Sequence, residues 1–354
     1  MNMITYSNFG KKLMALTLLI FTSTAILAQE EETDETKPKF TFGGSVDAYF
    51  KTNLSSSDAE AASPGSSFAE STGFALGMAN IIASYEGAKT GAVADLAFGP
   101  RGLQAVGGDA GIFVNQLYAY WNVSEATTLT LGRFNTYLGY EVISPTANFN
   151  YSTSYLFSYG PFSHVGLKAD FALSDDFSLM LAVMNVTDEN FSQFQGVPGA
   201  YSVGAQLGYA GQYLNFYYDG NAKLGFEIDY TGGFDLSDSF FLGINAAYQD
   251  NDGLGFYGAA LYPQYAASDS FTIGLRGEYF QEMGAYNAIG FGDTVEDESV
   301  LAVTLTGSYS IENFTIKPEI RIDNASDDLP SFLDNDGVAS KSLSSFLVAA
   351  IYAF

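Results

Sequence analysis

The stretch Phe271-Thr-Ile-Gly-Leu-Arg-Gly-Glu-Tyr-Phe280 alternates between two kinds of side chain. Apolar residues and one glycine occupy the odd-numbered positions, whereas Arg276 and Glu278 lie on the even-numbered positions. A period of two is typical of a β-strand, since successive side chains of a strand point to opposite faces. The stretch is therefore predicted to be a strand with one apolar face and one polar face.

The same alternation extends over other parts of the chain, in segments of similar length. It is clear in Lys39–Lys51, His164–Leu173, Leu224–Thr231 and Phe314–Asp323. A soluble β-sandwich also alternates, but its strands are usually shorter. Here the apolar faces often begin or end in Phe or Tyr, as expected for aromatic girdles at two membrane interfaces. These features predict an all-β fold, a transmembrane antiparallel up-and-down β-barrel.

The composition excludes several other classes of protein. Among the 354 residues are 30 Phe and 24 Tyr, too many aromatic side chains for a disordered chain. The chain has no repeated long apolar runs, which excludes a polytopic helical membrane protein. It has no Cys and a single His, His164, so disulfides, Cys-ligated metals and His clusters are excluded, and no cofactor is expected. The net charge of −26 argues against nucleic acid as a partner.

The first residues have the features of a secretory signal. Lys11 and Lys12 precede an apolar stretch that ends at Ala28, a small residue suited to cleavage. We expect a signal peptide over residues 1–28, a solvated acidic tail in the periplasm over residues 29–38, and the barrel over residues 39–354. Cleavage would remove two lysines and no acidic residue, so the net charge would change from −26 to −28.

Counting the connections gives the size of the barrel. Seven short turns are expected at Gly87–Thr90, Ser124–Thr127, Ser174–Asp176, Ala210–Gln212, Asp235–Ser239, Ala267–Ser270 and Ser310–Asn313. Eight longer polar segments alternate with them, at Thr52–Gly73, Gly99–Gly111, Asn135–Pro161, Val186–Ala200, Gly220–Lys223, Gln249–Leu254, Gln281–Ser299 and Asn324–Ser342. With both termini in the periplasm, seven turns and eight loops correspond to about 16 strands. The weakest strands are those around Phe74–Glu86 and Phe256–Tyr265, which leaves 14 and 18 as alternatives.

The C-terminus ends in alternating apolar residues. Counting back from Phe354, every second residue is apolar: Tyr352, Ala350, Val348 and Phe346. A terminal Phe after such a pattern resembles the C-terminal recognition signal of bacterial outer-membrane barrels. This segment is predicted to pair with the strand that begins near Lys39, because lipid tolerates no open sheet edge.

Several short motifs, most of them in the first half of the chain, resemble one family. They are Gly43–Tyr49, Asn115–Trp121, Leu129–Phe134, Gly139–Glu141, Asn148–Ser152, Gly160–Pro161, His164–Gly166 and Val183–Asn185. Together they resemble the OmpL-like β-barrel porins of gram-negative outer membranes. The resemblance covers most of residues 40–190, and the second half matches only in its barrel pattern. It implies a pore-forming protein of the outer membrane, and it brings no defined substrate or catalytic residue.

A barrel of this size is wide enough for an aqueous channel unless something folds inside it. The segment Asn135–Pro161 is long, rich in Tyr and Asn, and carries one charge, Glu141. We expect it to fold into the pore, the alternative being that it packs over the rim. The candidate pore-lining or constriction residues are Arg133, Glu141, Asn148, Asn150, Tyr151, Lys168, Asp170, Glu227, Asp229, Arg276, Glu278, Lys317, Glu319 and Arg321.

The inward charges admit two interpretations. Opposite charges on facing strands can create a transverse field across the pore, or they can pair with one another to stabilise the lumen. Because inward charges nearly balance, most of the negative charge lies in loops and tail, which favours a weak preference for cations. Arg133 falls on the apolar phase of its strand, so we expect a bulge at Gly132 that turns it inward.

The resulting hypothesis is a passive channel for small hydrophilic solutes or ions, in contact with outer-membrane lipid and open to homo-oligomerisation. The alternative is a non-conducting barrel with a structural or adhesive role, or a partner of a larger surface complex. Catalysis is not expected, because the lone His164 has no signature nucleophile beside it. Asp250–Gly253 and Asp334–Gly337 are expected to be ordinary turns rather than calcium loops, since their spacing does not match an EF-hand.

Overall fold

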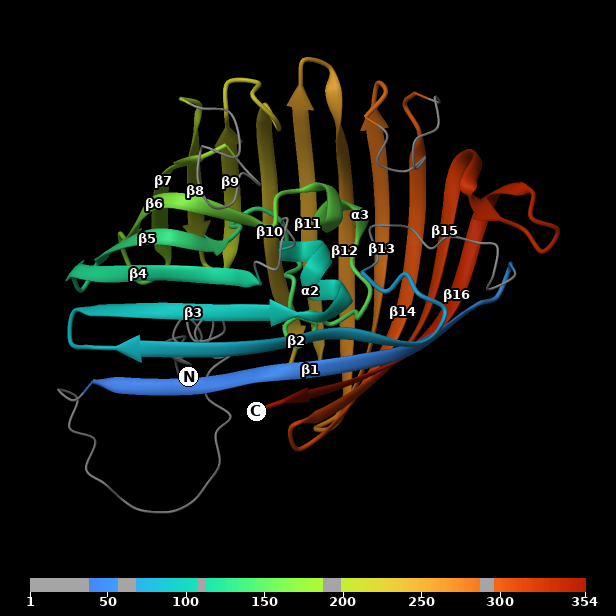
Figure 1. Cartoon of the computed structure of the whole chain (residues 1–354), viewed down its shortest axis with the longest axis horizontal. Helices are drawn as coiled ribbons and strands as arrows, with labels where there is room; N and C mark the ends of the chain where they lie inside the picture. Colours follow the sequence, from blue (N-terminus) through green and yellow to red (C-terminus); the bar gives the residue numbers. More distant parts are fainter. Residues whose placement is uncertain (1–37, 57–67, 107–112, 187–198, 287–295) are drawn as a thin grey trace, which may run out of the picture.

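The computed structural model describes residues 38–56, 68–106, 113–186, 199–286 and 296–354. Antiparallel strands close there into one barrel (Figure 1). The 16 strands are β1 (Lys39–Asn53), β2 (Gly73–Glu86), β3 (Thr90–Phe98), β4 (Val114–Ser124), β5 (Thr127–Asn135), β6 (Ser163–Ala172), β7 (Phe177–Asn185), β8 (Tyr201–Tyr209), β9 (Gln212–Tyr218), β10 (Phe226–Ser237), β11 (Phe240–Asn251), β12 (Leu254–Ser268), β13 (Phe271–Met283), β14 (Ser299–Ile311), β15 (Phe314–Leu333) and β16 (Ala339–Ala353). The predicted fold class and strand number are confirmed, including the two weakest strands. The predicted signal peptide and the acidic tail up to residue 37 lie outside the described residues.

The barrel closes where the C-terminal strand was expected to pair. β1 and β16 are antiparallel neighbours, with Ser45 opposite Ala353 and Asn53 opposite Ser345. Closure gives every strand two neighbours, which satisfies the backbone groups that lipid cannot solvate. The inner face of β16 is also apolar, because Leu347, Ala349 and Ile351 pack against Tyr49 and Tyr151.

The alternation seen in the sequence separates the two surfaces of the wall. On β13, Ile273, Leu275 and Tyr279 are exposed on the outside, whereas Arg276 and Glu278 are buried toward the interior. The outer surface therefore presents apolar side chains to lipid, and the charges of the strand lie within the barrel.

The seven expected short turns each join the predicted pair of strands. The last long connection is shorter than predicted, because β15 and β16 extend into the predicted loop, residues 324–342, and pair as far as Leu333 and Ala339. This extension is rich in Ser, Asp and Asn and lacks the apolar alternation that marks a membrane-spanning strand. Asp334 and Asp250 accept hydrogen bonds from the backbone of their own segments, as in ordinary turns.

Two helices lie inside the ring of strands (Figure 1). Helix α2 (Gly99–Val106) packs against β2, β3 and β4, and α3 (Tyr155–Tyr159) packs against β12 and β13. Both occur in segments predicted only as loops. In the described part of the chain, no helix has the length and apolarity needed to cross a membrane.

Candidate functional site

The connection between β5 and β6, residues 136–162, is here called the inner loop. It begins against the wall formed by β9 to β12. The Tyr137 hydroxyl donates to the carbonyl of Phe216 at 2.8 Å, and the backbone N–H of Gly139 donates to Asp229 Oδ1 at 3.1 Å. The ring of Tyr140 stacks on Tyr262, with centroids 4.3 Å apart. The first part of the inner loop therefore follows the inner wall rather than the rim.

The middle of the inner loop crosses to β14, β15 and β1. Lys317 Nζ donates to the carbonyls of Pro145 and Asn148, at 3.0 and 2.5 Å. Asn150 Nδ2 donates to Thr306 Oγ1 at 2.7 Å.

The next loop residue, Tyr151, contacts two strands at once. Its hydroxyl donates to Asp47 Oδ2 on β1 at 2.5 Å, and its backbone N–H donates to Glu319 Oε2 on β15 at 2.9 Å. Burial raises the pKa of Tyr151 above its ordinary value, so the phenol keeps its proton for this hydrogen bond.

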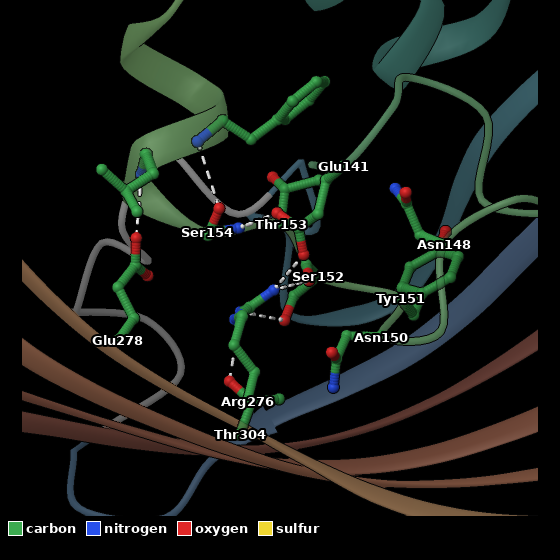
Figure 2. A network of polar contacts seen from close by, with 12 residues as sticks. Glu141, Asn148, Asn150, Tyr151, Ser152, Thr153, Ser154, Arg276, Glu278 and Thr304 are labelled. Carbon is green, nitrogen blue, oxygen red and sulfur yellow. Dashed lines mark hydrogen bonds and ion pairs between the residues drawn. The ribbon is translucent and has the colours of Figure 1, made fainter. Parts of the chain in front are cut away.

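Arg276 on β13 binds the last part of the inner loop, as Figure 2 shows. Its Nη1 donates to Glu141 Oε1 at 2.7 Å and to the carbonyl of Ser152 at 2.6 Å, and its Nη2 donates to Thr304 Oγ1 at 3.1 Å. The other oxygen of Glu141 accepts the backbone N–H of Ser154 at 2.6 Å. The one carboxylate of this loop thus connects the beginning of the loop to Ser154 near its end and to Arg276 of the wall.

Two more wall residues bind the turn that leads into α3. Glu278 accepts the backbone N–H groups of Tyr155 and Leu156, at 3.1 and 2.8 Å. Arg321 Nη1 donates to the carbonyl of Thr153 at 2.8 Å, while its Nε and Nη2 bind Asp323. Ser154 caps α3 by accepting the backbone N–H of Phe157 at 3.1 Å.

Helix α2 also binds the inner loop. Arg101 Nε donates to the carbonyl of Ile143 at 2.8 Å, and its Nη1 donates to the carbonyl of Tyr151 at 2.9 Å. The sequence pattern predicted a loop around Arg101 and did not reveal a helix. The Gly99-Pro100 pair was the available signal, because proline is favoured in the first turn of a helix.

These contacts share one feature, the binding of backbone groups of the inner loop by charged side chains. Carboxylates of the wall accept backbone N–H groups, and its cations donate to backbone carbonyls. The charged groups on this side are almost completely buried, with Arg276 0% and Glu319 2% exposed. On this side of the lumen, most inward charges bind the inner loop, and Arg321 also pairs with Asp323. They are therefore held in contacts and do not form an open transverse field.

The remaining predicted site residues lie elsewhere on the wall. Asp229 is buried on β10 and accepts Nδ2 of Asn245 at 2.7 Å, and Glu227 is buried on the same strand. Lys168 and Asp170 form an ion pair of 2.6 Å on β6, away from the cluster around Arg276. Their side chains keep 24% and 41% of their surface exposed.

The predicted bulge at Gly132 is wrong. The pairing of β5 with β4 and β6 runs without a register shift through this residue, and Arg133 lies opposite Leu117. Gly132 instead has a φ of 139°, a conformation open to glycine, and the Arg133 side chain is buried with its Nε donating to the carbonyl of Asn115. A local twist of the backbone at glycine takes the place of an inserted residue.

Aromatic packing near the inner loop was not predicted as a set. Phe68 lies beside Phe157 and Phe162, and Tyr155 and Tyr159 both contact Phe280. Phe280 lies on the polar phase of its strand in the sequence, and only the fold shows that it faces the inner loop. Within the described ranges, no group of three or more His, Cys, Asp and Glu is placed to hold a metal ion.

Comparisons with known proteins agree with this architecture. The family model described as beta-barrel porin-2, OmpL-like matches residues 39–354, so the family likeness extends beyond the first half of the chain. No curated protein gives a significant match by sequence.

Solved structures of outer-membrane proteins share the fold. The outer membrane channel DcaP of Acinetobacter baumannii has a TM-score of 0.58 at 12% identity, covering 93% of this chain and 100% of its own. The anion-selective porin from Comamonas acidovorans has a TM-score of 0.56 at 13% identity, with 90% and 100% covered. OmpT of Vibrio cholerae has a TM-score of 0.52 at 12% identity, with 92% and 100% covered. The chain belongs to the OmpL-like β-barrel porin family of the outer membrane.

Proposed function

We propose that this porin is a passive diffusion channel for small hydrophilic solutes or ions, narrowed by the inner loop. The observation that carries the proposal is the set of hydrogen bonds from the inner loop to β1, β13 and β15, made by Tyr151, Ser152 and their wall partners. A segment that leaves the wall between β5 and β6 and binds β13, β15 and β1 on the other side of the ring reduces the cross-section while the barrel keeps its shape. Solute would move down its gradient without covalent chemistry.

The route that remains runs beside β4 and β6. Inward-facing side chains there keep contact with solvent, as the exposure of Lys168 and Asp170 indicates. On β13 to β15, by contrast, Arg276, Lys317 and Arg321 are at most 4% exposed. A lumen filled from one side and accessible along the other supports a narrow, off-centre passage.

Releasing the inner loop should widen this passage. In Glu319→Gln an amide replaces a carboxylate that accepts the backbone N–H groups of Tyr151 and Ser152. Because the loop loses a charged acceptor, we expect a higher mean single-channel conductance in planar bilayers. Glu86→Gln is the matched control, since Glu86 is an exposed acid at the last residue of β2.

The control should conduct like the wild type, and heat-dependent mobility on gels would verify that both variants fold. A Glu319→Gln channel with wild-type conductance and noise would contradict the proposed narrowing. A folded wild-type barrel that passes no current would overturn the channel itself and favour the structural or adhesive alternative.

Ion preference should follow the charge outside the buried network. The accessible inward pair Lys168 and Asp170 is balanced, whereas the whole chain carries −26. We therefore expect a weak preference for cations, which falls as salt screens the acidic loops. The reversal potential under a potassium chloride gradient measures it, and a preference for chloride would contradict the expectation.

We also propose that the porin forms homotrimers. OmpT of Vibrio cholerae, which shares the fold with a TM-score of 0.50, has been solved in a trimer form. Native mass spectrometry of the detergent-extracted protein should give three times the mass of one chain. A monomer mass at every protein concentration would contradict the proposal.

A further inference from the structure

Two strands of the inner wall, β4 and β6, carry partly exposed polar and aromatic groups. Tyr118 and Tyr120 occupy the inward phase of β4, because Leu117 and Trp121 on the other phase are exposed to the outside. Lys168 and Asp170 occupy the inward phase of β6, where Leu167 faces out. We call Tyr118, Tyr120, Lys168 and Asp170 the free-wall patch.

Strand register brings these residues close together. Tyr120 lies opposite Thr130 of β5, which lies opposite Lys168 of β6. Since neighbouring strands are separated by about 4.8 Å, the backbones of Tyr120 and Lys168 are roughly 10 Å apart. Tyr118 follows at the next inward position of β4. Phenol rings and an ion pair therefore form one continuous surface.

The side chains of the patch are held in place. The ring of Tyr120 lies over Gly91 of β3, where a larger residue would meet it. Lys168 Nζ is 2.6 Å from Asp170 Oδ2 and 5.7 Å from the centroid of the Phe134 ring. Orientation by packing reduces the entropy that these side chains would otherwise lose when a solute binds.

The chemistry of the patch suits a neutral solute with many hydroxyl groups. Tyr hydroxyls donate and accept, Lys168 donates and Asp170 accepts, so the surface matches groups that also do both. The ion pair has no net charge and gives an ion little preference. The partly exposed phenol rings add apolar faces against which the C–H faces of a sugar ring can pack. Charged side chains that could favour an ion, such as Arg276 and Lys317, are bound to the inner loop.

We infer that the free-wall patch is a binding site for neutral saccharides on their way through the lumen. The inference deepens the proposed channel and depends on it. A saccharide that binds there would interrupt the ionic current, because it occupies the accessible part of the cross-section.

Single-channel recording with maltotriose as the probe tests the inference. The wild type should show saturable, concentration-dependent current interruptions. The double variant Tyr118→Ala/Tyr120→Ala should conduct ions but need about tenfold more maltotriose for the same effect, because both aromatic faces are lost. Asp170→Asn together with Lys168→Met should weaken the effect as well, since the Lys168 donor is lost and an amide replaces the stronger carboxylate acceptor.

Tyr213→Ala is the control, an inward tyrosine of β9 that lies opposite Gly208 and Thr231 and outside the patch. It should keep the wild-type response to maltotriose. Steady ionic steps that maltotriose never interrupts, or an equal response in the double Tyr variant, would overturn the saccharide site and leave the channel intact. The absence of any ionic current in the folded wild type would overturn the channel and the site together.

Discussion

An irregular chain segment inside a barrel must find partners for its backbone polar groups, and the rest of this structure depends on that constraint. Few waters can satisfy the N–H and C=O groups of a loop pressed against a wall, and each unpaired group is costly. Here Glu319 and Glu278 accept N–H groups, while Lys317, Arg276 and Arg321 donate to carbonyls. Charged side chains suit this role because their hydrogen bonds are the stronger kind.

The same constraint explains where the interior stays accessible. The inner loop binds the wall from β8 to β15 and β1, so the charges there contact the chain rather than solute. Lys168 and Asp170 on β6 pair with each other instead and keep contact with solvent. Selectivity in this porin would then come from a small surface of the wall rather than from the full ring of inward charges.

Much of the fold was predictable from the chain itself, since period-two alternation is imposed by lipid on one face and water on the other. The inward positions of Arg276, Glu278 and Arg321 followed from phase alone. Their hydrogen-bond partners could not be predicted in this way. The partners of Arg276 and Arg321 lie on the inner loop, more than a hundred residues away in the chain. Helix α2 escaped prediction because it spans only eight residues within a polar segment. The bulge at Gly132 was predicted wrongly because a glycine twist and a bulge look alike in sequence.

The central claim is that the inner loop is bound to the far wall of the lumen, and a short cross-link tests it most directly. The sequence has no cysteine, and Asn150 Nδ2 lies 2.7 Å from Thr306 Oγ1. A short bifunctional thiol reagent such as dibromobimane should therefore join the two thiols of Asn150→Cys/Thr306→Cys, visible as a mobility shift, with the same single-channel conductance before and after. Two thiols that stay free in the folded barrel, or a conductance that changes on cross-linking, would contradict the account.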